Sequence, residues 1–162
     1  MAQFPIRIRM PGSNMPDEQM SLAREEREAV QQYFDTSGFD WTQDTLSFVF
    51  LRGICSVAEQ MMHLAGVFVY SGTLPIHGFR CRLLLRCGNL SCIPDQVLLD
   101  IPAGYTGIMQ CWDGLLVHID VPVQDLREDT ILSGSDMSGQ MDHVELFPAD
   151  YSANGPDDRD GF

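Results

Sequence analysis

The sequence predicts an α+β fold in which two N-terminal helices pack on an antiparallel β-meander, with an acidic tail behind them. Apolar residues recur at the helical period in two stretches of the first 65 residues. Short β-rich runs separated by tight turns occupy residues 66–121, and acidic residues gather beyond them. These observations divide the chain into a globular domain over residues 1–122 and an acidic, partly disordered tail over residues 123–162.

The first elements expected are a short strand and a long helix. Apolar and polar residues alternate over Phe4–Met10, and Pro5 restricts this strand to the edge or the end of a sheet. Pro16 and the acidic residues after it are typical of a helix start. The helix ends in the glycine-containing segment Asp35–Asp40. Its apolar face consists of Leu22, Ala29, Val30, Tyr33 and Phe34.

A second helix is predicted over Arg52–Leu64. The apolar residues that follow its helical spacing are Ile54, Val57, Ala58, Met61, Met62 and Ala65. The β-branched and aromatic run Thr45–Leu51 either joins this helix or forms a separate strand. The methionine-rich face of the helix either packs in the core or forms an adaptable groove for a partner.

Strands are predicted for the rest of the globular domain. The candidates are Val67–Tyr70, Phe79–Arg86, Val97–Ile101, Thr106–Cys111 and Leu115–Val121. Short turns that contain glycine separate several of them, and such turns favour hairpins. Because connections this short join antiparallel neighbours, we expect a meander.

The acidic residues are concentrated at the C-terminal end of the sequence. Between Val121 and Phe162 there are ten Asp or Glu and two Arg. The Ser- and Gly-rich stretch Ser133–Gln140 is expected to be a flexible linker. The formal net charge of the whole chain is −13, which disfavours binding to nucleic acid and to anionic membranes.

Composition also bears on cellular location and on chemistry. All ten basic residues are Arg, which reflects either GC-rich codon usage or selection against ubiquitin attachment to Lys. Five cysteines and the lack of an N-terminal secretory pattern favour the reducing cytoplasm or nucleus. The Cys and His spacings match no zinc motif, and no hydrolase or phosphate-loop motif occurs. We therefore expect buried thiols, no metal, no cofactor and no catalytic residues.

Two glycine-containing segments resemble signatures of the trimeric dUTPases. Ala65–Gly72 resembles the first signature, and Ile101–Gly107 with the later Gly114 and Leu115 resembles the Ile-Pro-Pro-Gly-Tyr-Tyr-Gly segment and the second signature. The resemblance is closer to the degenerate, non-enzymatic version among adenovirus early-region-four proteins, which has Gly-Val-Tyr-Val-Phe before Ile-Pro-Pro-Gly-Tyr-Phe-Gly. Short segments such as Ile76–Phe79 are also similar to the early 34-kilodalton protein of adenoviruses.

The resemblance implies a degenerate dUTPase-like β-barrel whose catalytic residues are missing. Phe68 stands where the family has its first Asp, and Trp112 and Asp113 stand where it has Arg and Ser. A carboxylate in that place repels a triphosphate. The resemblance therefore implies a non-catalytic viral early or accessory protein that binds and redirects host proteins in the host cytoplasm or nucleus. The alternatives are a nucleotide-binding or divergent dUTPase-like enzyme, and a self-assembling structural protein.

Candidate partner-binding residues lie at three places in the sequence. They are Arg80, Arg82, Arg86, Trp112, Asp113, Asp160 and Phe162. The three arginines share one face of a predicted strand, where they bind either an anionic partner or the acidic tail of the same chain. The Trp-Asp pair marks the remodelled pocket. The final Asp-Gly-Phe is an ending that PDZ domains capture by strand addition.

Overall fold

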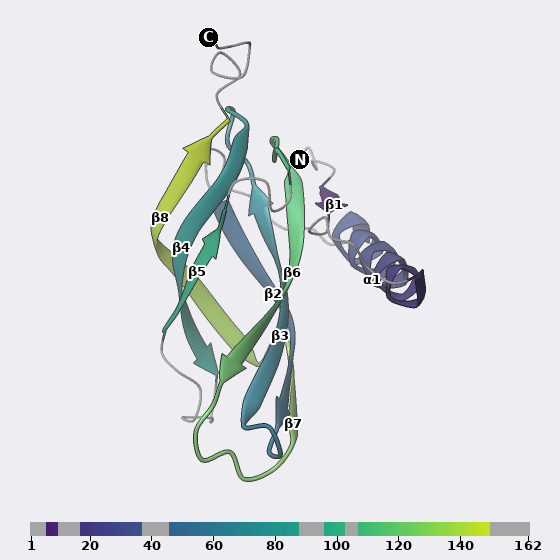
Figure 1. The fold of residues 1–162 in the computed structure, drawn as a ribbon, viewed down its shortest axis with the longest axis vertical. Helices are drawn as coiled ribbons and strands as arrows, with labels where there is room; N and C mark the ends of the chain where they lie inside the picture. Colours follow the sequence, from purple (N-terminus) through teal and green to yellow (C-terminus); the bar gives the residue numbers. More distant parts are fainter. Residues whose placement is uncertain (1–5, 10–16, 37–45, 88–95, 103–106, 150–162) are drawn as a thin grey trace.

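The computed structural model describes residues 6–9, 17–36, 46–87, 96–102 and 107–149 (Figure 1). Within these ranges the chain forms one helix and eight strands, which make two sheets. The elements are β1 (Arg7–Arg9), α1 (Asp17–Thr36), β2 (Leu46–Ser56), β3 (Met61–Tyr70), β4 (Ile76–Cys87), β5 (Gln96–Ile101), β6 (Asp113–Pro122), β7 (Thr130–Ser133) and β8 (Met137–Pro148). The described helix is not long and apolar enough to cross a lipid bilayer.

The two sheets face each other, and α1 lies on the outer side of the larger one (Figure 1). The larger sheet has the order β1-β6-β3-β2-β7, and the smaller has the order β5-β4-β8. β1 pairs with β6 in parallel, whereas the other pairs are antiparallel. The chain passes from the larger sheet to the smaller one after β3 and after β7. The result is three layers, with a hydrophobic core on each side of the larger sheet.

β3 lies at the centre of the larger sheet and is buried on both faces. Phe68 and Tyr70 belong to the core between the sheets, which we call the inter-sheet core. Val67 and Val69 belong to the core beneath the helix, which we call the helix-side core. Because both faces of the strand meet apolar layers, its sequence is almost continuously apolar, as is typical of a fully buried strand.

The helix-side core fixes α1 and β1 together. Val30 and Phe34 of α1 pack against residues of β3 and β6 and against Ile8 of β1. Gln31 strengthens this contact, because its Nε2 donates to the Ile6 carbonyl at 2.5 Å and its Oε1 accepts from the Ile8 N–H at 2.9 Å. A single amide side chain therefore takes the place of a neighbouring strand at this edge of β1.

The predicted second helix is wrong, because Arg52–Leu64 forms the end of β2, a tight turn and the start of β3. The turn is closed by a hydrogen bond from the Gln60 N–H to the Val57 carbonyl at 3.2 Å. Cys55 and Met62 lie opposite each other in the hairpin, both in the inter-sheet core. The apolar positions that fit a helical period also fit two strands that fold back on each other. The preceding Thr45–Leu51 segment is resolved as strand from residue 46 onward.

The predicted fold class is therefore wrong: one helix covers two packed β-sheets, and no meander and no pair of helices is found in the described residues. The predicted N-terminal helix is confirmed as α1, and four of the predicted strands lie within β3, β4, β5 and β6. The fifth, Thr106–Cys111, is not a strand over its described residues, where only Met109 makes an isolated bridge to Ile76.

Strands also form where the sequence predicts a flexible, acidic tail. Ser133–Gln140 comprises the end of β7, a turn and the start of β8, so the predicted flexible linker is wrong. β7 pairs with β2, and β8 pairs with β4 along most of its length. The boundary expected after residue 122 falls between β6 and β7, two strands of the same sheet. Residues 150–162 lie outside the described residues.

Loss of the Phe68 ring is expected to destabilise the fold strongly. Phe68 is fully buried, and its ring centroid lies 4.8 Å from that of Phe48 and 4.9 Å from that of Phe79. Phe68→Ala leaves a cavity between the sheets and should lower the free energy of unfolding by about 3–5 kcal/mol, measured by urea denaturation. Leu98→Ala is the control, since Leu98 is 76% exposed and should change stability by less than about 0.5 kcal/mol. Equal losses in the two variants would contradict this packing.

Candidate functional site

The pocket expected from the dUTPase resemblance is occupied by core packing and by an ion-pair cluster. Phe68, at the position of the first signature Asp, contributes its whole side chain to the inter-sheet core. Trp112 has a left-handed backbone, with φ of 70°, and packs against the helix-side core. The turn before β6 is closed by hydrogen bonds from the Trp112 N–H to the Tyr70 carbonyl at 2.6 Å and from the Asp113 N–H to the Gln110 carbonyl at 2.9 Å.

Asp113 is 1% exposed and is neutralised by two arginines of β1. Arg7 Nη2 lies 2.7 Å from its Oδ1, and Arg9 Nη1 lies 3.2 Å from its Oδ2. The Gln110 N–H also donates to Oδ2, at 2.8 Å, and Arg9 donates to the Ile108 carbonyl as well. Arg7 and Asp113 are register partners in the parallel β1–β6 pair. This carboxylate therefore anchors β1 to the sheet and leaves no open face toward a substrate.

The arginine face of β4 is largely paired within the chain. Arg80 lies 3.6 Å from Asp100 and 3.3 Å from Glu145, and its guanidinium stacks over the Phe147 ring at 5.7 Å. Arg82 makes a bidentate contact with Asp142, in which Nε donates to Oδ1 at 2.6 Å and Nη2 donates to Oδ2.

Two of these carboxylates, Glu145 and Asp142, belong to the segment that was expected to be an acidic tail. The hydrogen bond from Arg82 and then that from His143 hold the pKa of Asp142 well below its usual range. Of the two partners that the sequence left open for the arginines, the structure pairs Arg80 and Arg82 with their own chain. Arg86 is exposed, and no ion pair joins it to a carboxylate within the described residues.

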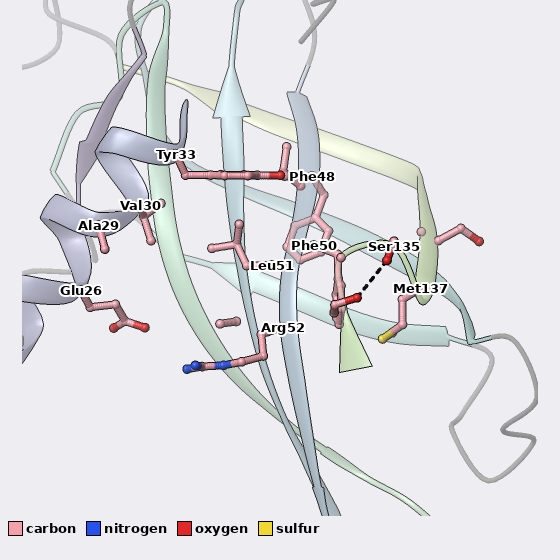
Figure 2. Close-up of a pocket in the computed structure, with 16 residues that line it drawn as sticks. Glu26, Ala29, Val30, Tyr33, Phe48, Phe50, Leu51, Arg52, Ser135 and Met137 are labelled. Carbon is pink, nitrogen blue, oxygen red and sulfur yellow. Dashed lines mark hydrogen bonds between the residues drawn. The ribbon is translucent and has the colours of Figure 1, made fainter. Parts of the chain in front are cut away.

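A groove of about 950 Å³ lies between α1 and β8, with the edge of β2 as its floor (Figure 2). Ala29, Val30 and Tyr33 line it from α1, and Figure 2 shows the Tyr33 side chain extending from the helix toward β2. Its full lining is Glu26, Ala29, Val30, Tyr33, Phe48, Val49, Phe50, Leu51, Arg52, Ala65, Ser133, Gly134, Ser135, Met137, Ser138 and Gly139. Apolar and small side chains dominate, with one acidic and one basic residue.

The methionine-rich face that was weighed as a partner-binding groove is mostly core. Met62 is fully buried in the inter-sheet core, whereas Ile54 is 39% exposed on the opposite face of the hairpin. The groove found in the structure lies elsewhere and was not predicted. Tyr33 was placed on the apolar face of the first helix, but only the fold brings it near Phe48 and Phe50 of β2.

The described residues contain no group of three or more His, Cys, Asp or Glu side chains placed to hold a metal ion. Cys55 and Cys81 are buried, and burial raises the pKa of the Cys81 thiol to about 11. Cys111 is exposed. The two remaining candidates for partner binding, Asp160 and Phe162, lie outside the described residues.

His63 is the best-paired histidine on the exposed part of the larger sheet. Its Nε2 lies 2.7 Å from Glu59 Oε1, and its Nδ1 lies 2.7 Å from Asp120 Oδ1. The hydrogen bond with Glu59 and then that with Asp120 raise the pKa of His63 above 6.5. The stabilisation that this arrangement contributes is present below pH 6.5 and is lost as the pH rises through the folded-state pKa.

The comparisons with known proteins add no family assignment. No protein-family model matches the chain, and no curated protein and no solved structure matches it.

Neutralising Asp113 should destabilise the protein. Asp113→Asn keeps an oxygen that accepts from Gln110 but removes the negative charge beside Arg7 and Arg9. We expect a loss of about 1–3 kcal/mol in the free energy of unfolding, measured by urea denaturation. Asp100→Asn breaks only an exposed pair and should cost less than about 1 kcal/mol. A loss at Asp113 no larger than that at Asp100 would contradict the anchoring role.

The His63 titration should depend on Asp120. We expect its midpoint, followed by NMR of the imidazole protons, to lie above the reference value of 6.5 in the folded protein. Asp120→Asn removes one of the two negative partners and should lower this pKa. Asp125→Asn is the control, because no contact joins Asp125 to His63 and Asn tolerates the positive φ of 59° at this position. An unchanged midpoint in Asp120→Asn would exclude the pairing seen in the structure.

Proposed function

We propose that this chain is a non-catalytic binding protein whose partner is another protein, held in the groove between α1, β2 and the turn that joins β7 to β8. The observation that carries the proposal is the groove itself, because its walls expose Tyr33, Phe48 and Phe50 around a volume of about 950 Å³. Aromatic side chains in a concave site are the usual anchors of protein recognition. None of the lining residues forms a nucleophile-base pair or a carboxylate pair.

The groove chemistry favours a protein partner over a nucleotide. A triphosphate needs several cations or a loop of backbone N–H groups, whereas Arg52 is the one cation among the described lining residues. Glu26 lies in the same lining, and its Oε1 accepts a hydrogen bond from His118 Nε2 at 2.9 Å. The formal charge of −13 adds long-range repulsion of anions. An apolar segment of a protein meets none of these obstacles.

We further propose that the partners are host proteins and that the chain acts as a viral early or accessory protein. The resemblance to the adenovirus early-region-four proteins, over Ala65–Gly72 and Ile101–Gly107, supports this assignment. The position of Phe68 in the core and the engagement of Asp113 with arginines support a role without catalysis. The absence of Lys is consistent with work beside ubiquitin ligases.

Nucleotide assays test the absence of catalysis. With dUTP and Mg²⁺ the purified protein should release no pyrophosphate above a blank, and dUTP should leave the melting temperature unchanged. Hydrolysis that disappears in Asp120→Asn, which changes an exposed carboxylate, would overturn the proposal, because it would assign catalysis to that carboxylate. A raised melting temperature with dUTP would favour the nucleotide-binding alternative.

Blocking the groove tests its role in partner binding. Ala29→Arg places a long side chain in the groove from an exposed helix position, and Gln32→Arg adds the same charge to α1 outside the lining. Proximity labelling in host cells should recover a set of proteins with the wild-type chain that is lost with Ala29→Arg and retained with Gln32→Arg. An identical set for all three proteins would place the binding surface elsewhere.

A further inference from the structure

We infer that the groove binds an extended peptide segment of the partner protein, which adds as a strand to the outer edge of β2. This inference rests on the proposed function and specifies how the partner is recognised. Strand addition supplies affinity through main-chain hydrogen bonds, and the side chains of alternate residues supply specificity. The occupant is accordingly defined by its conformation and by its apolar pattern.

The outer edge of β2 is only partly covered. β3 pairs with β2 from Leu46 to Ser56, whereas β7 pairs with it only from Arg52 to Cys55. The register with β3 shifts between Phe50 and Arg52, and β7 stops at the same point. In the described part of the chain no strand therefore pairs with the outer edge of β2 over Ser47–Phe50. Every second residue of an antiparallel strand directs its N–H and C=O outward. Gly134 of the β7–β8 turn lies against the Phe50 carbonyl, since a Cβ on Gly134 would approach that oxygen to 2.9 Å. The template for another strand is therefore Ser47–Val49.

The walls beside this edge suit the two faces of an added strand. Val49 and Leu51 of β2 pack toward the helix-side core, and α1 adds Ala29 and Tyr33 on that side. Phe48 and Phe50 pack toward the inter-sheet core, where the start of β8 forms the other wall. A strand presents its successive side chains to opposite faces. A peptide with apolar residues on both faces at its centre would thus bury them against α1 on one side and against the β2 aromatics and β8 on the other.

The geometry favours a single strand from a partner protein over a second copy of this chain and over the C-terminal residues of the same chain. A second copy of this chain would have to bring a whole sheet to the β2 edge, but α1 and β8 flank that edge on both sides (Figure 2). Residues 150–162 of this chain contain four Asp and Pro156 and have no alternating apolar pattern, so they are poor strand formers. The net charge of −13 favours a neutral or basic peptide.

Peptide selection tests the inference directly. Phage displaying random peptides of about twelve residues are selected on the full chain and counter-selected on Ala29→Arg. We expect enriched peptides with continuous or alternating apolar residues over the central four to six positions, and without central proline. A synthetic peptide of that sequence should bind Ala29→Arg at least about tenfold more weakly than wild type, and Gln32→Arg equally well. Ser138→Tyr, with Gln140→Tyr as its control, repeats the comparison from the β8 wall.

Methylation of single peptide amides then identifies strand addition. Only every second amide of an added strand donates to β2, so the losses of affinity should alternate along the peptide. Enriched peptides with helical spacing, or losses without alternation, would overturn strand addition while leaving the groove as the binding site. Failure to enrich any peptide that distinguishes wild type from Ala29→Arg would overturn it as well. Sedimentation showing a dimer that Ala29→Arg dissociates would assign the edge to a second copy.

The outcomes separate this inference from the function on which it rests. If host proteins are lost from Ala29→Arg in cells but the selected peptides lack the strand pattern, the groove binds partners by another mode. If the proximity-labelled set is the same for all variants, the groove is not the partner site and both proposals fail.

Discussion

Burial of β3 on both faces is the constraint on which the other elements depend. A strand covered on one face only would need a single apolar layer, but β3 carries Phe68 toward one sheet and Val67 and Val69 toward a helix. The first face requires the smaller sheet, and the second requires α1 and β1. The close approach of Phe48 to Gly66 shows how tightly this centre is packed, since a Cβ on Gly66 would lie 2.2 Å from the Phe48 ring. The two cores are therefore formed from one strand outward.

The sequence predicted local structure correctly where the spacing of the apolar residues fits only one kind of element. The prediction was wrong where the same spacing fits both a helix and a pair of strands. α1 has a polar face and an apolar face, so its helical pattern has no competing interpretation. In Arg52–Leu64 the apolar residues satisfy both a helix and two half-buried strands, and the turn between them contains no glycine or proline to mark it. Whether this segment forms a helix or two strands is decided by its pairing with strands that are distant in the sequence. That pairing cannot be deduced from a single sequence.

The role of charged residues in the acidic C-terminal segment was equally hard to predict from the sequence. Asp142 and Glu145 read as a solvated tail in the sequence, yet in the fold they lie beside Arg82 and Arg80 across β4 and β8. Asp113 likewise suggested a remodelled pocket, and it proved to hold β1 in place. Charged residues here form ion pairs between neighbouring strands. Which residues pair depends on the strand register, which cannot be predicted from this single sequence. The groove could not be predicted for a related reason, because its lining comes from α1, β2, β3, the turn between β7 and β8, and the start of β8.

The two edge strands of the larger sheet limit how this sheet can pair with other chains. β1 is three residues long and carries Arg7 and Arg9, and β7 is four residues long, so both ends of the larger sheet are short. Short and charged edge strands resist pairing with other chains. Growth of the larger sheet from either of its ends is therefore disfavoured, and with it the stacking of many copies through that sheet into fibres. The long edge strand of the molecule is β8, with twelve residues, and it belongs to the smaller sheet.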